Sequence, residues 1–466
     1  MAIDPASFRD TAGQVYVADG RVFRTVRRAA IDDYVFVRDS NALAPLIERG
    51  AVIGCEEVDG AQLGEDAPDG GMVLEHRKIP FWSYPYEWPF GALKAAALAH
   101  LDIQIELLDQ DIALSDASAY NVQFLGPRPI FIDTLSFRRY RENEHWVGHR
   151  QFCEQFLNPL LLRARFGVPF QDWYRGRPEG IPTENLASLT TWRHCLSWRM
   201  LSHVIMPSRL QAAANDRVME SAVKARARGL PKWSYRATLV QLRSWIAKLS
   251  IQGHGKSVWG TYAGDNTYDQ TNVRQKRAMV VEFVKAVGPR QLLDLGCNTG
   301  DYSALALETG AKSVVGLDAD HGALEQAFDR ATAEGLDFLP LYQDSANPSP
   351  GQGWNAKERK SLSQRCEGVD AVIALALEHH LAIGRNIPLP EVVGWIVGLA
   401  PEGLIEFVQK DDPTIQKMLA LRDDIFSEYS LENFIAALER HARIKRRQQV
   451  SKSGREIFWF QRTTRP

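Results

Sequence analysis

Two glycines and several polar residues in one short turn are the residues of this chain best suited to hold a ligand. The turn and the strand after it contain Asp294, Gly296, Cys297, Asn298, Gly300 and Asp318. Glycine allows a sharp bend and lets the backbone lie close to a bound molecule. A helix that starts near Gly300 would present unpaired N–H groups, and Asp318 could accept hydrogen bonds from ribose hydroxyls. These features predict a site for an adenosine-containing ligand.

A strand, turn, helix and second strand are needed to bring these residues together. The apolar run at residues 292–295 is typical of a buried parallel strand. Residues 302–309 predict a helix, and residues 314–317 predict a second strand that ends at Asp318. In an open parallel sheet, ligands bind beyond the carboxyl ends of the strands. The pattern therefore places the site at that edge of a sheet.

The type of ligand follows from what the turn lacks. Asn298 stands where the motif G-x-G-x-x-G would place its middle glycine, so a dinucleotide site is not indicated. No Gly-Lys-Ser/Thr follows, which excludes a P-loop. Asp294, just before the first glycine, suits a cationic head group better than a pyrophosphate. S-adenosylmethionine carries an ammonium and a sulfonium beside its ribose and fits these residues best.

The turn Asp-Leu-Gly-Cys-Asn-Thr-Gly at residues 294–300 resembles the first motif of class I S-adenosylmethionine-dependent methyltransferases. The resemblance extends over roughly residues 259–460. It implies an α/β fold with a doubly wound, seven-stranded, Rossmann-like sheet over residues 256–466. It also implies that Asp318 binds the ribose and that Asp344 meets the adenine. The alternative is a doubly wound domain that has lost its ligand.

The cofactor site implied by this resemblance consists of Asp294, Gly296, Cys297, Asn298, Gly300, Asp318 and Asp344. We expect Cys297 to pack as a small side chain rather than to act as a nucleophile. Tyr262 or Tyr268, upstream of the first strand, is a further candidate to line the site, unless both belong to the core of the adjoining domain. Further strands are expected at residues 338–342, 369–376, 403–408, 444–450 and 456–460, the last two as an antiparallel pair.

Two histidines follow the fourth expected strand, where the acceptor of the methyl group should lie. Residues 378–381 read Glu-His-His-Leu and are expected to form a loop. An oxygen or nitrogen acceptor benefits from a base with a pKa near neutral, so His379 is the candidate base and His380 the second choice. The alternative is that either histidine caps the strand end. The family has no universal catalytic residue, and no Asp/Asn-Pro-Pro-Tyr sequence supports amino methylation of DNA bases here.

Residues 1–185 predict an α+β domain that either selects the acceptor or resembles a degenerate protein-kinase lobe. Asp116 and Asn121 have the separation of the base and the metal-binding Asn in a kinase catalytic loop, and Asp133 follows a predicted hairpin. However, the first hundred residues contain no V-A-I-K lysine and no G-x-G-x-x-G loop, and Asp-Thr-Leu replaces Asp-Phe-Gly. The alternative is that Asp116 and Asp133 only cap turns.

Two further stretches have both a functional and a structural interpretation. Residues 80–90 contain six aromatic residues among three prolines, which predicts either a platform for a sugar or base or, as we favour, packing beneath a long loop. Residues 186–255 predict a basic helical bridge with helices at 186–206, 209–228 and 235–249. Its basic residues favour a solvated helix surface over a face for nucleic acid, which nevertheless stays open.

The composition is that of an ordinary globular protein. Of the 466 residues, 45% are hydrophobic and 24% charged, and the formal net charge is −2, so no general attraction to polyanions is expected. No run approaches about 18 apolar residues, so no membrane span is expected. The N-terminal residues lack the features of a secretory signal. Five widely spaced cysteines without C-x-x-C favour reduced thiols in the cytoplasm and predict no metal site.

The segments Asp-Ala-Ser-Ala-Tyr-Asn and Ile-Asp-Thr-Leu-Ser-Phe, together with the methyltransferase-like region, also resemble bacterial proteins grouped with a rhizobial host-specificity nodulation protein. That resemblance covers most of the chain and implies no settled substrate. The favoured function is methyl transfer to an oxygen or nitrogen acceptor, with a small or carbohydrate-like acceptor preferred. Two alternatives stay open: a bifunctional protein with a nucleotide-binding kinase-like lobe, and a non-catalytic module that binds the cofactor.

Overall fold

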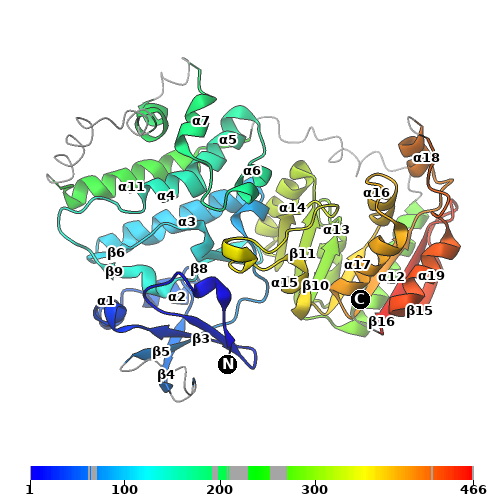
Figure 1. Cartoon of the computed structure of the whole chain (residues 1–466), viewed down its shortest axis with the longest axis horizontal. Coiled ribbons are helices and arrows are strands. Elements are labelled where there is room, and N and C mark those ends of the chain that lie inside the picture. Colours follow the sequence, from blue (N-terminus) through cyan, green and yellow to red (C-terminus); the bar gives the residue numbers. More distant parts are fainter. Residues whose placement is uncertain are drawn as a thin grey trace. The chain divides into compact units, whose positions relative to one another are not determined.

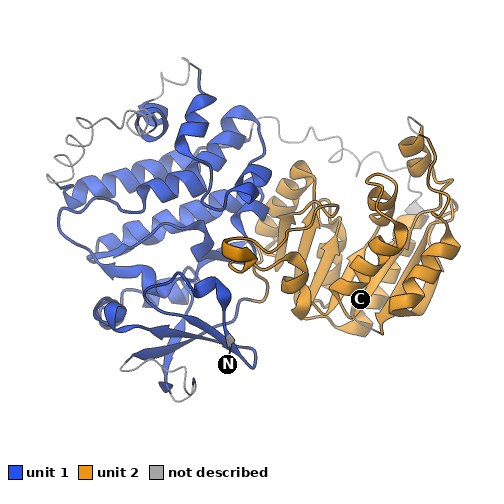
Figure 2. Ribbon diagram, viewed as in Figure 1, with its two compact units in different colours: residues 1–79, 83–124, 128–253 blue, residues 80–82, 125–127, 254–466 orange. Residues whose placement is uncertain are grey.

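A computed structural model of the chain describes residues 2–60, 63, 71–191, 198–206, 208, 229–251, 270–420 and 423–463. The chain divides into two compact units, which Figure 2 shows in different colours. Unit 1 contains residues 1–79, 83–124 and 128–253, and unit 2 contains residues 80–82, 125–127 and 254–466. The described part of the expected helical bridge thus belongs to unit 1.

Unit 2 is built on a seven-stranded sheet with the order β12-β11-β10-β13-β14-β16-β15 (Figure 1). Its strands are β10 (Gln291–Leu295), β11 (Ser313–Asp318), β12 (Phe338–Tyr342), β13 (Ala371–Ala374), β14 (Glu402–Phe407), β15 (Ala442–Gln449) and β16 (Glu456–Arg462). Strands β10 to β14 pair in parallel, whereas β16 is antiparallel to both β14 and β15. This order confirms the class I methyltransferase fold that the sequence resemblance implied.

The helices of unit 2 are α12 (Gln270–Val287), α13 (Asp301–Thr309), α14 (His321–Glu334), α15 (Leu362–Arg365), α16 (Glu378–Ala382), α17 (Leu389–Leu399), α18 (Pro413–Leu419) and α19 (Leu431–His441). The expectation of a loop at residues 378–381 is wrong, because these residues form most of α16. Glu-His-His-Leu contains no Gly or Pro to stop a helical turn, and the first such residue is Gly384.

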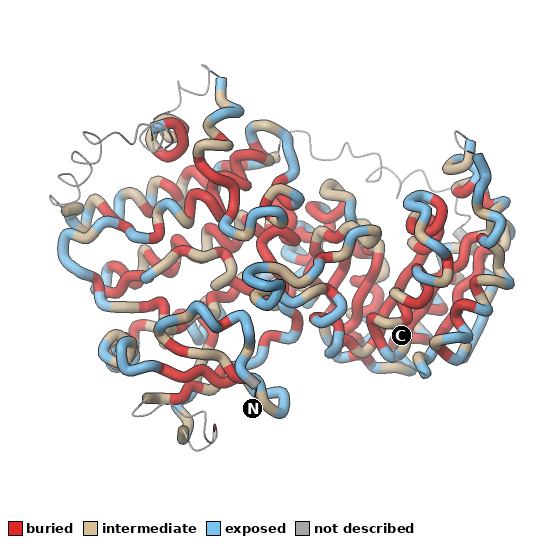
Figure 3. The backbone as a smooth tube through the Cα atoms, viewed as in Figure 1, coloured by how far each residue is buried: buried red, intermediate tan, exposed pale blue. Residues whose placement is uncertain are grey.

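Both faces of this sheet are covered, as its apolar strands require. Successive strand residues point to opposite faces. Leu292 and Phe338 belong to one core cluster together with residues of α12, α13 and α14. On the opposite face, the ring of Phe434 in α19 lies 5.0 Å from that of Phe407 and 5.1 Å from that of Phe458, measured between centroids. Figure 3 shows β10 to β14 and β16 as buried along most of their length, whereas the edge strand β15 is mostly exposed.

Unit 1 begins with a five-stranded antiparallel sheet of order β1-β2-β3-β5-β4. Its strands are β1 (Ala2–Ile3), β2 (Val15–Ala18), β3 (Arg21–Val26), β4 (Cys55–Val58) and β5 (Met72–His76), with α1 (Arg28–Asp39) and α2 (Ala44–Glu48) between β3 and β4. Two small sheets follow, β6 (Ile112–Leu114) with β9 (Phe137–Arg139) and β7 (Val122–Leu125) with β8 (Arg128–Phe131). The pair β7–β8 is the predicted hairpin before Asp133.

A helical layer completes unit 1 around the long helix α3 (Phe90–Leu108). The other helices are α4 (His149–Phe152), η6 (Cys153–Leu157), α5 (Asn158–Phe166), α6 (Gln171–Gly176), α7 (Thr183–Ser188), α8 (Trp198–Met200), η8 (Leu201–Ile205) and α11 (Lys232–Ala247), where η6 and η8 are π-helical. Buried His100 of α3 packs its ring 5.6 Å from Phe152 and 5.8 Å from Phe156. These contacts make α3 the centre of the layer.

Three described basic residues of the expected bridge, all on α11, are paired with acids of unit 1. The pairs are Lys232–Asp111 (2.6 Å), Arg236–Asp109 (2.9 Å) and Arg243–Asp102. Because their charges are matched by acidic residues of α3 and the turn after it, they support the interpretation as a helix surface rather than a face for nucleic acid. The remaining residues, Arg209, Arg217, Lys224, Arg226 and Arg228, lie outside the described part of the chain.

The aromatic stretch at residues 80–90 is mostly interior. Phe81, Tyr84, Tyr86, Trp88 and Phe90 are buried, and Trp82 is 38% exposed. The indole N–H of Trp88 donates to the Ser83 hydroxyl at 2.9 Å, and its ring meets Phe124 edge-on. The packing interpretation is therefore confirmed, and the idea of an aromatic platform for a sugar loses its support.

Membrane and thiol features agree with the sequence where they are described. Among the described residues, no helix combines the length and the apolar character that a bilayer crossing requires. Cys55, Cys153, Cys297 and Cys366 are free thiols, whereas Cys195 lies outside the described residues.

One buried ion pair joins α12 to β14. The Nζ atom of Lys276 lies 2.6 Å from Oε1 of Glu406, and the two side chains are 4% and 0% exposed. Removing one partner of such a pair leaves an uncompensated buried charge and costs about 3–5 kcal/mol. The same helix also makes an exposed pair, between Glu282 and Arg446 of β15.

We expect Lys276→Met to lower the free energy of unfolding of unit 2 by about 3 kcal/mol, because buried Glu406 loses the cation that it contacts and keeps only Arg455, 4.0 Å away. Calorimetric melting of the full chain measures the change. Arg446→Ala is the matched control and should cost less than about 1 kcal/mol, since exposed pairs contribute little. Adding Glu406→Gln to Lys276→Met should recover part of the loss. Equal effects of the two single variants would contradict the prediction.

Candidate functional site

The turn between β10 and α13 has a backbone that few residues other than glycine adopt. Gly296 and Gly300 have φ angles of 73° and 82°, and Asn298 has a φ angle of 49°. Glycine carries no steric penalty in this region, and Asn tolerates it better than most residues. A Cβ atom on Gly300 would also lie 2.4 Å from Cε1 of Phe338. Asn298 is thus a third left-handed residue of the turn, which the sequence analysis had not recognised.

Asp318 closes this turn from the end of β11. Its Oδ2 accepts the N–H of Asn298 at 2.8 Å, and its Oδ1 accepts the N–H of Asp320 at 2.8 Å. Burial raises the pKa of Asp318, while these backbone donors oppose the shift. Each carboxylate oxygen has a further lone pair available to a hydroxyl donor. The carboxylate is therefore held at the carboxyl edge of the sheet, in the position expected of a ribose-binding acid.

Asp294 and Cys297 face the interior of unit 2. Oδ2 of Asp294 accepts the hydroxyl of Ser303 at 2.7 Å, which ties β10 to α13. Burial raises the pKa of Asp294 to about 7. Cys297 is 5% exposed, lies in the core cluster and leaves no room for a side chain at Gly316. Burial also raises the pKa of the Cys297 thiol, so its role is packing, as expected.

Asp344 lies one strand further along the same edge. The N–H of Gln343 donates to the carbonyl of Asp318 at 2.8 Å, which links the ends of β11 and β12. Oδ1 of Asp344 accepts the N–H of Ala346 at 2.9 Å, and Oδ2 lies 3.2 Å from Nη2 of Arg385. The structure thus places Asp344 beside Asp318 along the edge. Tyr262 and Tyr268, also expected near this site, lie outside the described residues.

Similarity to a known protein extends over nearly the whole chain. Over 457 residues the chain is 46% identical to the nodulation protein NoeA of Rhizobium meliloti (strain 1021), which covers 98% of this chain and 95% of that protein. The chain belongs to the NoeA family. The resemblance to bacterial nodulation proteins is thereby confirmed, and no family model matches the chain.

Two methyltransferases are also similar to this NoeA-family chain over shorter stretches. It is 32% identical over 118 residues to the ribosomal protein L11 methyltransferase of Tolumonas auensis (strain DSM 9187 / NBRC 110442 / TA 4), over 25% of this chain and 32% of that protein. It is 13% identical to the N-methyltransferase NodS of Bradyrhizobium japonicum WM9, solved with S-adenosyl-L-homocysteine, over 45% of this chain and 95% of that chain, with a TM-score of 0.33. That score is too low to support an argument.

The sheet order and the turn therefore carry the assignment of unit 2. Its strand directions are those of class I methyltransferases, and its glycine turn and Asp318 stand at the edge where such sheets bind their cofactor. This NoeA-family chain is thus an S-adenosylmethionine-dependent methyltransferase by fold and by cofactor motif.

The two candidate bases lie on α16, after the strand that neighbours β10. His379 is 1% exposed, and its Nδ1 has no hydrogen-bond partner among the described residues. His380 is half-buried, and the two ring centroids are 4.2 Å apart. Burial lowers the pKa of both imidazoles, so both are neutral at pH 7 and retain a lone pair.

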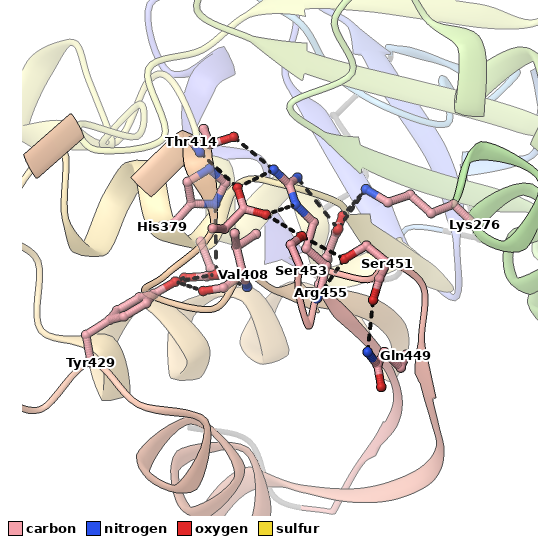
Figure 4. A network of polar contacts seen from close by, with 12 residues as sticks. Lys276, His379, Val408, Thr414, Tyr429, Gln449, Ser451, Ser453 and Arg455 are labelled. Carbon is pink, nitrogen blue, oxygen red and sulfur yellow. Dashed lines mark hydrogen bonds and ion pairs between the residues drawn. The ribbon is translucent and has the colours of Figure 1, made fainter. Parts of the chain in front are cut away.

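Glu378, fully buried beside these histidines, takes part in a closed ring of hydrogen bonds (Figure 4). The N–H of Val408 donates to its Oε1 at 2.9 Å. The hydroxyl of Tyr429 lies 2.8 and 3.0 Å from its two carboxyl oxygens and 2.7 Å from the carbonyl of Val408. Since Tyr429 has one proton and donates it to Val408, a proton on Glu378 completes the ring. Burial raises the pKa of Glu378 to about 8, so this proton is present at neutral pH.

A second cluster of charges lies in the same network (Figure 4). Nε and Nη2 of Arg455 donate to the two carboxylate oxygens of Asp412 at 2.7 and 2.8 Å, and Ser453 donates to Oδ2 at 2.7 Å. Burial would raise the pKa of Asp412, but these donors hold it below its usual range. Nη1 of Arg455 lies 4.0 Å from Glu406, which connects the cluster to the buried pair on β14.

The sequence analysis missed most of this network. The missed residues of the network are Glu378, Asp412, Tyr429 and Arg455, and Ser303 beside the glycine turn was also missed. They come from separate elements, so no local spacing connects them. The one available signal was a charged residue shortly after a strand, as in Glu378, which lies four residues after the end of β13.

In unit 1 the three kinase-like residues come together. Nδ2 of Asn121 donates to Asp116 at 2.9 Å and to Asp133 at 3.3 Å. Arg24 of β3, which the sequence analysis did not identify, pairs with Asp133 at 2.5 Å and with Asp10 at 2.6 Å. Burial, with the nearby charge of Asp133, raises the pKa of Asp116 to about 7. The side chain of Asp133 makes no cap hydrogen bond to the turn that follows it.

Glu378→Gln tests the proton assigned to Glu378. The amide still accepts from Val408 and donates to Tyr429, so the variant keeps both hydrogen bonds. In the wild type the pKa of Glu378 is about 8 in the folded state and near 4.3 in the unfolded state. The contribution of Glu378 to the free energy of unfolding is therefore fully present below pH ~4.3. It falls by about 1.4 kcal/mol per pH unit as the pH rises from there to about 8. The variant lacks this loss, so its free energy of unfolding relative to wild type should rise by about 2–3 kcal/mol from pH 5.5 to 7.5.

Denaturant unfolding at the two pH values measures this difference. Tyr429→Phe serves as the control, because it keeps the carboxyl group and loses a hydrogen bond, which should cost about 1–2 kcal/mol. A difference between Glu378→Gln and wild type that stays constant with pH would mean that Glu378 is ionised in the folded protein.

Proposed function

We propose that this chain transfers the methyl group of S-adenosylmethionine to an oxygen or nitrogen atom of a small molecule, in a nodulation-related process. One observation carries the cofactor part of this proposal. Asp318 is held by the amides of Asn298 and Asp320 next to a glycine turn, at the edge where parallel sheets bind ligands. The relation to nodulation rests on the 46% identity to NoeA.

The residues of the turn fit this cofactor. Asp318 would accept from the ribose hydroxyls and Asp344 would lie near the adenine, while Gly296 and Gly300 let the backbone approach closely. When bound, S-adenosylmethionine supplies an electrophilic methyl group on a sulfonium. The contribution of the chain is to hold cofactor and acceptor in line, and such positioning supplies much of the acceleration.

Of the two candidate bases, we propose His380 as the group that takes the proton of the acceptor. It is half-buried, so an acceptor can reach it, whereas His379 is 1% exposed. Nδ1 of His379 lies 3.9 Å from Oε1 of Glu378, which suits a positioning role within α16. This assignment reverses the order of preference drawn from the sequence, because burial was not visible there.

A small-molecule acceptor is supported by charge and burial. The net charge is −2, and the described basic residues of α11 are paired with acids, which favours a small molecule over nucleic acid. The preference for a carbohydrate-like acceptor rested partly on the aromatic stretch, which is buried. Under this proposal unit 1 selects the acceptor.

Asp318→Ala should weaken binding of S-adenosylmethionine and S-adenosylhomocysteine by about 10- to 150-fold, because hydrogen bonds to a charged group contribute about 1.5–3 kcal/mol. Isothermal titration calorimetry of the full chain measures this. Asp320→Ala is the matched control. It removes the side-chain cap of α14, which accepts from Gly322 and Ala323, at a cost of about 1 kcal/mol of stability. Because its backbone N–H remains, binding should stay within about threefold.

The same experiment separates the alternatives. Absence of binding to either ligand by the wild-type chain would overturn the proposal. Equal loss of binding in both variants would trace the effect to folding. Binding without transfer of a labelled methyl group to any acceptor in a lysate would favour a non-catalytic module.

A second candidate function is phosphoryl transfer by unit 1. The observation that favours it is the meeting of Asp116, Asn121 and Asp133 with Arg24 of β3. In protein kinases the corresponding groups are the base, two magnesium ligands and a cationic residue on the third strand. Here Arg24 neutralises Asp133, so a bound phosphate would have to draw the guanidinium away before Asp133 could hold magnesium.

For this second function, Mg-ATP at about a hundred times its Kd should stabilise the wild-type chain by roughly 2.7 kcal/mol, and Asp133→Asn should abolish the thermal shift. Asp111→Asn is the control, because it makes the same substitution at an exposed position of the same unit. The absence of any shift in the wild type would exclude the second function and leave the methyltransferase proposal unaffected.

A further inference from the structure

Two histidines and a cysteine of unit 1 converge at one point. His149 begins α4, Cys153 begins η6, and His203 lies within η8. Nε2 of His149 lies 3.2 Å from Nδ1 of His203 and 3.8 Å from Sγ of Cys153. One ligand atom of each residue lies within 4.8 Å of the others. None of these residues belongs to either site described above.

We propose that His149, Cys153 and His203 bind one zinc-type transition-metal ion through two imidazole nitrogens and a thiolate. A set of two nitrogens and one sulfur suits zinc, and cobalt(II) can replace zinc at such sites. Three protein ligands leave a fourth position for water or an added ligand. His149 is half-buried, and Cys153 and His203 are buried.

Two of the three separations match the edges of a tetrahedral site. Zinc lies about 2.0–2.1 Å from nitrogen and about 2.3 Å from sulfur, so tetrahedral angles place two nitrogens about 3.3 Å apart and nitrogen and sulfur about 3.6 Å apart. The corresponding distances here are 3.2 and 3.8 Å. The third edge, between Sγ of Cys153 and Nδ1 of His203, lies within 4.8 Å, so the three side chains have to draw together along this edge to hold an ion.

Hydrogen bonds alone account for these contacts less well. A ring nitrogen of neutral imidazole either donates or accepts. If Nε2 of His149 donates to His203, it has no lone pair for the Cys153 thiol. If it accepts instead, a single lone pair has to serve both neighbours. A cation uses one lone pair from each of the three atoms at once.

The two imidazoles have the protonation state that a metal requires, and the thiol can reach its metal-binding state when a metal binds. Burial lowers the pKa of His149 and lowers that of His203 to about 4, so both imidazoles are neutral, which is their metal-binding form. Burial raises the pKa of the Cys153 thiol to about 12. On binding, the thiol proton passes to water, and the ion compensates the charge of the thiolate.

The local backbone supplies an independent indication. Both η6 and η8 are π-helical, and single π-helical turns are rare and frequent at functional sites. The prediction of no metal site considered only the spacing of the cysteines. His149 and Cys153 are four residues apart, but His203 is 54 residues from His149 in the sequence, so only the fold shows the third ligand.

The test is the metal content of the untagged full chain after incubation with zinc and desalting, measured by plasma mass spectrometry. We expect about one zinc per chain in the wild type and at least a tenfold lower content in Cys153→Ser and His203→Gln. Cys366→Ser and His321→Gln are matched controls from unit 2 and should keep the metal. Cobalt(II) should give a thiolate charge-transfer absorption that Cys153→Ser lacks.

A measurement on the wild type covers the case that a variant fails to fold. Zinc should slow alkylation of Cys153 by a maleimide at least tenfold, as followed by peptide mass spectrometry, and should leave Cys55 unaffected. A zinc content below about a tenth per chain in the wild type would overturn the proposal. Retention of zinc in Cys153→Ser and His203→Gln would also overturn it.

Discussion

Two backbone amides on one carboxylate hold the cofactor edge of unit 2 together. Asp318 accepts from Asn298 and from Asp320, so the end of β11 is joined both to the turn after β10 and to the start of α14. In this arrangement Asn298 adopts a left-handed conformation, and Gly296 and Gly300 on either side of it do so too. Because β10 and β11 pair in parallel, the turn after β10 and Asp318 at the end of β11 lie at the same edge of the sheet.

A second physical constraint is the low polarity of the protein interior, which acts on the buried carboxyl groups near the ends of β13 and β14. Asp412 keeps its charge because Arg455 and Ser453 donate to it. Among the residues that the structure describes, no cation hydrogen-bonds to Glu378, and burial raises the pKa of its carboxyl group to about 8. Buried charges persist where they are paired and fully hydrogen-bonded, whereas an unpaired acid takes up a proton. The two carboxyl groups therefore differ in protonation although both are interior.

Unit 1 uses the same principles for different chemistry. Arg24 forms an ion pair with Asp133, whereas burial raises the pKa of Asp116, the other carboxyl partner of Asn121, to about 7. Elsewhere in the unit, burial keeps His149 and Cys153 neutral until a cation offers compensation. In both places the groups come from elements that are distant in the sequence and are brought together by the packing of the helical layer and the sheets around α3.

The sequence by itself determined the glycine turn and the acid at the end of the next strand, because both depend on local spacing. The resemblance of these residues to a known motif then implied the strand order and the class of cofactor. The sequence also identified Asp116, Asn121 and Asp133, because their separations repeat a known pattern. Only the tertiary structure decided that residues 378–381 are helical, that His380 is more accessible than His379, that Glu378 carries a proton, and that Arg24 meets Asp133 and His203 meets His149. Burial and distance through space depend on how separate elements pack, and no local pattern in the chain encodes them.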